Sequence, residues 1–324
     1  MRRQAPVGES RVVVIGASGF VGSAVCRSLQ EFGAIVIGRA APRIQSTPDS
    51  DDAEGAVQRA AAELRPSIVG ASAVVNAAGI SDAGSGELAA LGGANSLLPA
   101  AVAMACASEG VRLIHVSSAA VQGRRECLDD SPEVDPLTPY ARSKADGERL
   151  VHQANPAAVI YRPPGVHGES RSVTRSLARL SASPASSVAS PGDSNAPQVL
   201  IRDVADAVAF LALCPQAPPP IVHHPPSGLT TSGILRLLSG GREPRRVPVW
   251  AARFLILLAH TAGWVSPSSA ADARRLEVLW CGQDQAPSWL TAQGWKGSST
   301  EEDWCVLGQR VRTGKPNSYA KDGQ

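Results

Sequence analysis

The chain is poor in aromatic residues, which make up only 4% of its 324 positions. Proteins that stack nucleic-acid bases need such rings. The net charge is +2 and no long run of Lys or Arg appears. The composition therefore predicts that nucleic acid is not a partner of this protein.

Closely spaced cysteine pairs are also missing. Disulfide frameworks and zinc sites both need cysteines at short, regular spacing, and a His223-His224 pair has no carboxylate or cysteine at ligand spacing. We therefore expect reduced thiols, a cytoplasmic protein and no metal site. The six cysteines are scattered over positions 26, 106, 127, 214, 281 and 305.

Long hydrophobic runs are absent as well. The first ten residues, MRRQAPVGES, are polar and lead straight into an expected strand, which is not the pattern of a secretory signal. The most apolar later run, 254–259, is flanked by Arg253 and His260 and is too short to span a bilayer. We expect a buried or amphipathic helix there and no membrane partner.

A glycine-rich turn near the start organises the rest of the chain. Residues 11–22 read RVVVIGASGFVG, with an apolar run ending at Gly16 and glycines following as Gly19 and Gly22. The pattern then becomes helical. Glycines let a pyrophosphate approach the backbone, and a helix N-terminus offers unpaired N–H groups. A strand, glycine turn and helix in this order predict a dinucleotide site.

Strand and helix patterns alternate beyond this turn. Such alternation predicts an α/β fold with a doubly wound parallel sheet of the Rossmann type. Pro66 is expected to end the helix predicted at 52–64. The expected strands are 34–37, 71–76, 111–116, 157–161 and 221–223, and the expected helices are 52–64, 92–109, one beginning near Tyr140, and 203–213.

The C-terminal part has a different composition. Residues 169–198 are rich in Ser, Ala and Pro, a pattern we interpret as surface structure outside the core. Helices over 231–238 and 249–264 predict a smaller mixed lobe. The predicted division is a dinucleotide-binding domain at 11–165 with sheet and helix returns near 199–223, a substrate lobe at 166–312, and flexible termini at 1–10 and 313–324.

The end of the second expected strand bears on the choice of cofactor. An acidic residue there would bind a ribose 2′-hydroxyl, whereas an arginine suits a 2′-phosphate. No Asp or Glu follows before Asp49, while Arg39 and Arg43 are both available. Of the two cofactors NAD(H) and NADP(H), this favours NADP(H). Two arginines in a solvated loop, with no role in binding, would give the same sequence pattern.

Tyr140 and Lys144 are the candidate chemical groups. Four residues apart on an expected helix, they lie on the same face. An ammonium beside a phenol favours the phenolate and lowers its pKa from about 10. Ser118, after the neighbouring strand, could polarise a substrate carbonyl. By itself the same spacing also suits a surface pair on an amphipathic helix.

The ordered motifs GASGFVG (16–22), NAAG (76–79), Asn95, VSSAAVQG (116–123), YARSK (140–144) and RPPGVHG (162–168) resemble the extended short-chain dehydrogenase/reductase family, over residues 11–213. Its sugar-nucleotide epimerases and reductases are the most similar in pattern. The resemblance implies catalytic roles for Ser118, Tyr140, Lys144 and Asn95, and a homodimer built on helices of the 92–109 and 140–155 type. It implies cofactor contacts at Gly16, Ser18, Gly19, Phe20, Val21, Gly22, Arg39, Ala77, Ala78, Gly79, Ser117, Tyr140, Lys144, Pro163 and Val166.

Departures from the family pattern narrow the reaction. Dehydratases of the family carry Asp-Glu where this chain has Ala119-Ala120, so we expect 4-epimerisation or ketoreduction instead of dehydration. Gly165 replaces a common asparagine and Gln122 a common tyrosine. Arg202 is the only arginine near the position that often binds a substrate diphosphate.

Three functions therefore stay open. The first is an NAD(P)-dependent oxidoreductase or epimerase, a nucleotide-sugar 4-epimerase or 4-ketoreductase acting on a small-molecule substrate. The second is reduction of a non-sugar ketone, steroid-like or polyketide, which the apolar stretch 249–264 would suit. The third is a protein that senses a dinucleotide without catalysis. His115 is expected in the core, and His167 is a weaker site candidate.

Overall fold

The computed structural model describes residues 10–80, 88–263 and 267–314. A six-stranded parallel sheet runs through its centre in the order β10-β6-β4-β3-β1-β2. This confirms the predicted doubly wound α/β fold. Of the predicted flexible ends, 1–9 and 315–324 lie outside the described residues. The strands are β1 (Arg11–Ile15), β2 (Ile35–Arg39), β3 (Ala73–Asn76), β4 (Arg112–Val116), β6 (Val159–Arg162) and β10 (Ile221–His223).

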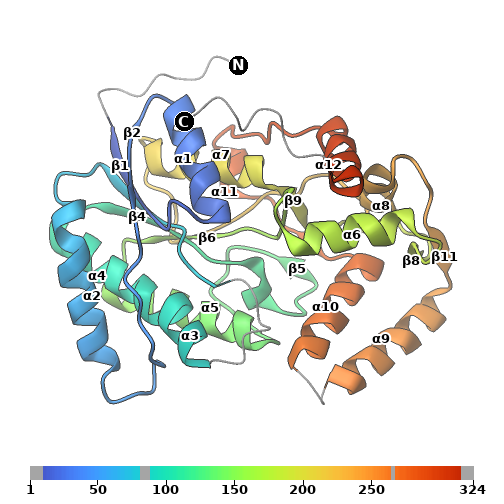
Figure 1. Ribbon diagram of the computed structural model, residues 1–324, viewed down its shortest axis with the longest axis horizontal. Coiled ribbons are helices and arrows are strands. Elements are labelled where there is room, and N and C mark those ends of the chain that lie inside the picture. The colour runs from blue at the N-terminus through green and yellow to red at the C-terminus, as the bar shows by residue number, and fades with distance from the viewer. Residues whose placement is uncertain (1–9, 81–87, 264–266, 315–324) are drawn as a thin grey trace.

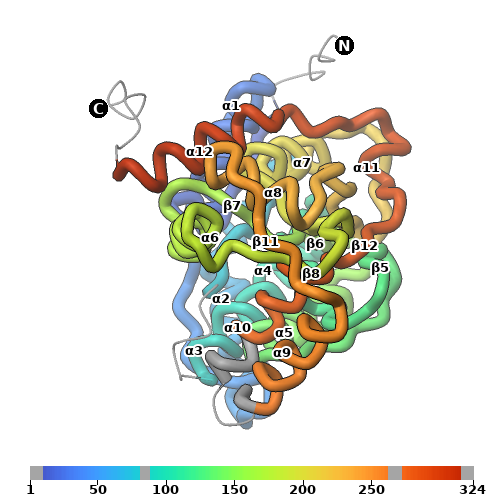
Figure 2. Tube along the Cα trace, turned by 90° about the vertical axis from the view of Figure 1, so that its right-hand side faces the viewer, coloured from blue at the N-terminus to red at the C-terminus, as the bar shows by residue number. Residues whose placement is uncertain are grey.

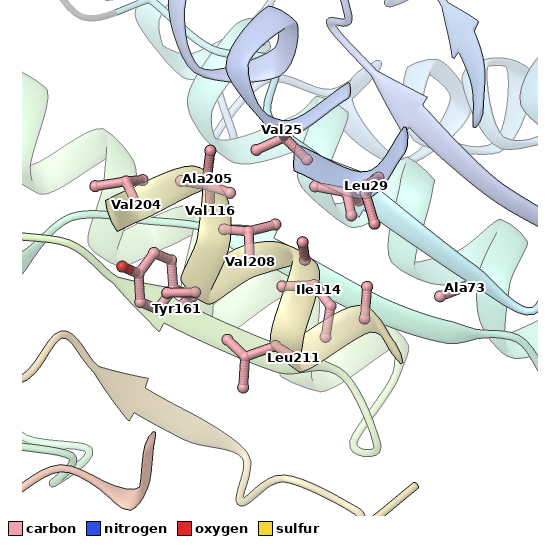
Figure 3. Close-up of a cluster of buried hydrophobic side chains, with 14 of the residues drawn as sticks. Val25, Leu29, Ala73, Ile114, Val116, Tyr161, Val204, Ala205, Val208 and Leu211 are labelled. Atoms are coloured by element: carbon pink, nitrogen blue, oxygen red, sulfur yellow. The ribbon is translucent and has the colours of Figure 1, made fainter. Parts of the chain in front are cut away.

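Helices cover both faces of this sheet (Figure 1). One face carries α1 (Phe20–Glu31) and α7 (Ile201–Leu213), and the other carries α2 (Ala53–Ile68), α4 (Leu98–Glu109) and α5 (Pro139–Ala154). Successive strand residues point to opposite faces. Thus Val12 and Val14 pack with α1 and α7, as Figure 3 shows for the neighbouring strands, while Val13 packs with α2 and α4.

The strand order reverses at β1. The chain passes from β1 through α1 to β2 on one side, and then through α2 to β3 on the other. Ligands of open α/β sheets bind at such a switch point, beyond the carboxyl ends of the strands. In this protein those ends are Gly16 after β1 and residues 77–79 after β3.

A continuous helical stretch, Leu88–Glu109, packs between α2 and α5. By length and composition alone it could span a membrane, but 72% of its most apolar window is buried within the protein. The stretch consists of α3 (Leu88–Gly92), a π-helical segment (Gly93–Leu97) and α4. Its apolar composition is therefore explained by its place in the core.

The C-terminal lobe has its own core, formed by α6 (Ser172–Ala182), α8 (Thr231–Ser239) and α12 (Glu301–Thr313). The expectation that 169–198 would stay outside a core is wrong for part of this segment, because Thr174, Ala178 and Val188 are fully buried. Small side chains let α6 approach its neighbours closely, so a segment with few large hydrophobic residues still packs. Short parallel pairs join β7 (Gly165–His167) to β9 (Gln198–Leu200) and β8 (Ser187–Ala189) to β11 (Arg245–Val247).

The last third of the chain returns to the sheet. After α9 (Val249–Gly263) and α10 (Pro267–Cys281), β12 (Asp284–Gln285) pairs with β5 (Cys127–Leu128), and α11 (Trp289–Ala292) follows. Leu290 and Trp295 pack into the core beneath α7. The sheet therefore draws core residues from both ends of the sequence.

Pro66 does not end its helix, contrary to the sequence prediction. It lies in the last turn of α2, which continues to Ile68, and the N–H of Val69 still bonds to the carbonyl of Arg65. A proline this close to a helix end removes its own N–H donor but leaves only one short turn beyond it.

A buried ion pair fastens α5 to the sheet. The guanidinium of Arg162, at the end of β6, donates to the carboxylate of Glu148 at 2.7 Å, and the two side chains are only 1% and 6% exposed. Ser117 donates to the same carboxylate at 2.5 Å, and Arg162 also donates to the carbonyl of Ser131. The pair thus links α5, β4 and β6.

Replacing Glu148 with leucine should lower the free energy of unfolding by about 3–5 kcal/mol, because the Arg162 charge would stay buried without its partner. Denaturant unfolding at neutral pH measures this. Asp52→Ala, which breaks an exposed ion pair with Arg59, is the control and should change stability far less. Equal effects of the two variants would contradict the role given to the buried pair.

Candidate active site

The glycine turn leaves an open cradle at the switch point. Gly16 has a φ of +80°, and a Cβ there would lie 2.8 Å from the backbone of Ala78. A Cβ on Gly22 would lie 2.1 Å from the carbonyl oxygen of Gly16. Helix α1 begins at Phe20, and no side chain caps its N-terminus. The backbone N–H groups of that first turn are thus available to an anion.

The segment after β3 completes the other wall of the cradle. The side chain of Asn76 accepts a hydrogen bond from the N–H of Ala78 at 3.2 Å, which fixes the turn. Gly79 has a φ of +159°, and a Cβ there would lie 2.7 Å from Oδ1 of Asn95 and 3.2 Å from Nζ of Lys144. Only glycine leaves room for these two side chains.

Asn95 holds this segment in place. It is fully buried in the π-helical segment, a distortion that is frequent at functional sites. Its Oδ1 accepts from the N–H of Ile80 at 2.9 Å, while its Nδ2 donates to the carbonyl of Ile80 and to Oγ of Ser143. Asn95 therefore ties the loop after β3 to α5.

Tyr140 lies in the first turn of α5, which Thr138 caps through a bond from the N–H of Ala141. Burial raises the pKa of Tyr140. A hydrogen bond with Ser118 and the positive charge of Arg171 both act in the opposite direction. The structure thus brings Tyr140 and Ser118 into contact across α5 and the end of β4.

Lys144 is buried one helical turn further along. Its Nζ donates to the carbonyl of Val116 at 3.1 Å. Burial lowers the pKa of Lys144 to about 8, against the opposing influence of the Glu148 carboxylate. The sequence analysis expected Lys144 to lower the pKa of Tyr140. In the structure burial raises that pKa, and the groups that act against burial are Ser118 and Arg171.

Arg171 is a site residue that the sequence analysis missed. Its guanidinium lies 5.3 Å from the centre of the Phe20 ring, at the glycine turn, and its charge also acts on Tyr140. The signal in the sequence was an arginine three residues after the RPPGVHG motif, ahead of α6. It places a positive charge between the glycine turn and the tyrosine.

His167 has a fixed structural position. Nε2 lies 2.7 Å from the side-chain oxygen of Gln198, so it carries the proton, and Nδ1 accepts from the hydroxyl of Thr174 at 3.1 Å. Burial lowers the pKa of His167 to about 4. His115 lies in the core as expected, with its Nδ1 3.2 Å from Nδ2 of Asn76. Both rings are therefore uncharged at neutral pH.

Other predicted contact residues lie around the same edge of the sheet. Arg39 is exposed at the end of β2, and its carbonyl accepts from the N–H of Gly16 at 2.9 Å. Pro163 lies at the end of β6 and accepts from the N–H of Ala119. Ser117 instead turns into the protein and bonds Glu148. The remaining predicted residues lie in the glycine turn (Ser18, Gly19), in the first turn of α1 (Val21), after β3 (Ala77) and in β7 (Val166).

A cavity of about 600 Å³ adjoins the glycine turn. It lies between α1, the start of α7 and α12, and the loop that follows β7 also lines it. Arg27, Arg202 and Arg310 line it, with Arg310 paired to Glu169 at 2.7 Å. Glu169 and Asp303 line it as well, so the lining carries one more positive than negative side chain near the open N-terminus of α1.

No group of three or more His, Cys, Asp or Glu able to hold a metal occurs in the described part of the chain. His224 bonds Tyr161 through Nδ1 at 2.6 Å, and burial lowers its pKa to about 3. His223 bonds the carbonyl of Ala286 through Nε2. Both histidines thus contribute to packing of the β10 edge.

A doubly wound sheet, with an open glycine cradle at its switch point and a Tyr–Lys pair beside it, defines a Rossmann-type dinucleotide-binding protein. The model of the NAD dependent epimerase/dehydratase family matches residues 12–222, more than half of the chain. The chain belongs to this family. An adenine dinucleotide suits the cradle, since its pyrophosphate needs the close backbone approach that Gly16 and Gly22 allow.

Solved structures with this fold cover nearly the whole chain. A dTDP-4-dehydrorhamnose reductase from Bacillus anthracis, in complex with NADP, is 16% identical, with a TM-score of 0.61 over 95% of this chain and 100% of that one. A UDP-glucuronic acid 4-epimerase from Bacillus cereus, in complex with NAD, is 15% identical, with a TM-score of 0.62 over 94% and 97%. A dTDP-glucose 4,6-dehydratase from Streptomyces venezuelae is 17% identical, with a TM-score of 0.60 over 93% and 97%.

Among curated proteins, methionine adenosyltransferase 2 subunit beta from Xenopus laevis is 30% identical over 175 residues. The match covers 52% of this chain and 51% of that protein. The chain thus spans about half the length of this relative.

Dinucleotide affinity should fall by about tenfold as pH rises through about 8, because Lys144 then loses the ammonium that would bind ribose hydroxyls. Calorimetric titration of the protein with NADP⁺ at several pH values measures this. Lys144→Met should bind weakly at every pH, with no step, whereas the exposed Lys296→Met should follow the wild type. A step that persists in Lys144→Met would contradict the assignment.

Proposed function

We propose that this protein is a nucleotide-sugar 4-epimerase or 4-ketoreductase that uses NAD(P), with a preference for NADP(H). The observation that carries the proposal is one cluster. Tyr140, Ser118, Lys144 and Asn95 meet at the edge of the sheet where the glycine cradle opens. A protein that only bound a dinucleotide would need the cradle but not a tyrosine in contact with a serine hydroxyl.

Each side chain has a role that follows from its contacts. A bound nicotinamide would accept or donate a hydride. The phenolic oxygen of Tyr140 accepts the hydroxyl proton when the substrate alcohol is oxidised and donates a proton to the carbonyl oxygen when the ketone is reduced. Ser118 donates a hydrogen bond to the same substrate oxygen. Lys144 holds the cofactor ribose once its ammonium leaves the Val116 carbonyl. Asn95 keeps Gly79 and α5 at the separation this requires.

The charges around the cradle support an anionic substrate. Arg202 lacks the family position for a diphosphate, but it lines the cavity beside the glycine turn together with Arg27 and Arg310. Arg310 is paired with Glu169, which leaves Arg27 and Arg202 in the cavity, and Arg171 adds a positive charge that acts on Tyr140. These arginines could replace the missing diphosphate contact, since guanidinium groups suit phosphate oxygens.

Epimerisation or reduction is favoured over dehydration. Ala119 and Ala120 follow Ser118 in a short 3-10 helix (Ala119–Gln122), and neither side chain can transfer a proton. The preference for NADP(H) follows from Arg39, which ends β2 next to Gly16, with Arg43 shortly after it. The dehydrorhamnose reductase, the epimerase and the dehydratase all share the fold, so only Ala119 and Ala120 disfavour dehydration.

A second candidate is a non-catalytic subunit that binds a dinucleotide. It is favoured by the resemblance to a protein named as a subunit of methionine adenosyltransferase. Reduction of an apolar, non-sugar ketone is a third candidate, and the apolar helix α9 in the C-terminal lobe favours it.

Tyr140→Phe should lower turnover by about 10²- to 10⁴-fold while dinucleotide affinity stays within a few-fold, because only proton transfer is lost. The assay follows UDP- and dTDP-sugars and their 4-keto forms with NAD and NADP. Arg142→Ala, on the exposed side of the same helix, is the control and should keep wild-type turnover.

The three candidates give different results in this assay. If the protein turns over an apolar ketone but no nucleotide sugar, the third candidate is supported, and the role of Tyr140 in proton transfer is unchanged. Dinucleotide binding without turnover of any carbonyl would favour the non-catalytic subunit. Unchanged turnover in Tyr140→Phe would overturn the mechanism.

A further inference from the structure

Helix α9 exposes its apolar side chains to solvent. The exposed fractions are 76% for Trp250, 57% for Phe254, 60% for Leu257 and 48% for Leu258. A scattered exposed leucine is ordinary, but a contiguous group of large apolar side chains marks an interaction surface. We call these four residues the α9 apolar face.

Helical spacing shows that this face points away from the protein. Positions 250, 254, 257 and 258 follow the i, i+4, i+7, i+8 pattern of one helix side. Ala252 and Ile256 lie on the opposite side, where they are buried beside Trp280 of α10. The inner side of α9 is therefore packed against the protein. No element in the described part of the chain covers its outer side.

Three exposed arginines lie on α9 or just before it in the sequence. Arg253 is exposed on the same helix side, and Arg245 and Arg246 are exposed in β11 immediately before α9. No Asp or Glu occurs between positions 244 and 261. The nearest acidic residues in the sequence are Glu243 before this stretch and Asp272 after it, and they are paired with Arg236 and Arg275. Glu277 of α10 contacts His260 of α9 and is paired with Arg274. The stretch from 244 to 261 itself carries only positive charge.

We propose that α9 binds the surface of an anionic lipid bilayer, with its apolar face in the headgroup region and Arg245 and Arg253 on lipid phosphates. Aromatic and leucine side chains on one face with arginines beside them are the composition of interfacial helices. The helix is too short to cross the hydrocarbon core. The proposal departs from two expectations of the sequence analysis, a buried or amphipathic helix at this run and no membrane partner, because α9 is apolar on both its inner and its outer side.

A second copy of the chain fits this surface less well. A two-fold contact over α9 would bring the arginines of both copies together without carboxylates to pair them. The dimer expected from the family resemblance also uses α4 and α5 instead. In both views α9 lies at the outer edge of the C-terminal lobe, well separated from α1 (Figures 1 and 2). The glycine turn at the start of α1 would stay accessible on a bilayer-bound protein.

Flotation of the full chain with vesicles tests the proposal. Vesicles of phosphatidylcholine with added phosphatidylglycerol should carry the protein, and phosphatidylcholine alone should carry much less. Phe254→Ser with Leu257→Ser should reduce binding by about tenfold or more. Arg245→Glu with Arg253→Glu should remove the preference for anionic lipid, and high salt should weaken wild-type binding.

Leu88→Ser, a change at an exposed leucine far from α9 in the sequence, is the matched control and should bind as the wild type does. All variants change solvent-exposed side chains, and circular dichroism verifies that they fold. Equal vesicle binding by the wild type and the Phe254/Leu257 variant, or no binding by either, would overturn the proposal. A change from dimer to monomer in that variant, without a change in vesicle binding, would make α9 a protein interface instead.

Discussion

The buried contact between Glu148 and Arg162 governs the geometry of the site. It joins α5 to β6, and Ser117 brings β4 to the same carboxylate. Tyr140, Lys144 and Glu148 follow one another at four-residue steps and lie on one side of α5. The ion pair of Glu148 therefore fixes the rotation of α5 about its own axis. With that rotation fixed, Tyr140 meets Ser118 and Lys144 reaches the end of β4. Two charges removed from water thus position groups that a dinucleotide and substrate would contact.

The backbone supplies the rest of the site through close approach. At Gly16, Gly22 and Gly79, a methyl group would collide with neighbouring backbone or with Asn95. These contacts bring β1, α1 and the loop after β3 together at the switch point of the sheet. Asn95 then ties that loop to α5 from a π-helical segment. The cradle and the tyrosine helix are thereby linked through one buried amide, while Arg171 faces both from the C-terminal lobe.

Much of this could be predicted from the sequence, since local patterns determine it. Alternating apolar runs and the glycine spacing predicted the parallel sheet, and the family match confirms the resemblance. The burial of part of 169–198 was missed because small residues such as Ala178 pack without a hydrophobic signature. Arg171 and Glu148 were missed because their partners Phe20 and Arg162 are distant in sequence. The outward face of α9 was also hidden, since hydrophobicity alone does not say which side is covered.

The most direct test of the account is a crystal structure of the protein with bound NADP⁺. The account places the pyrophosphate at the N-terminus of α1 against Gly16 and Gly22, with the ammonium of Lys144 moved from the Val116 carbonyl to the ribose hydroxyls. The phenol of Tyr140 should face the nicotinamide. A dinucleotide bound elsewhere, or one that leaves Lys144 on the Val116 carbonyl and far from the ribose, would contradict it.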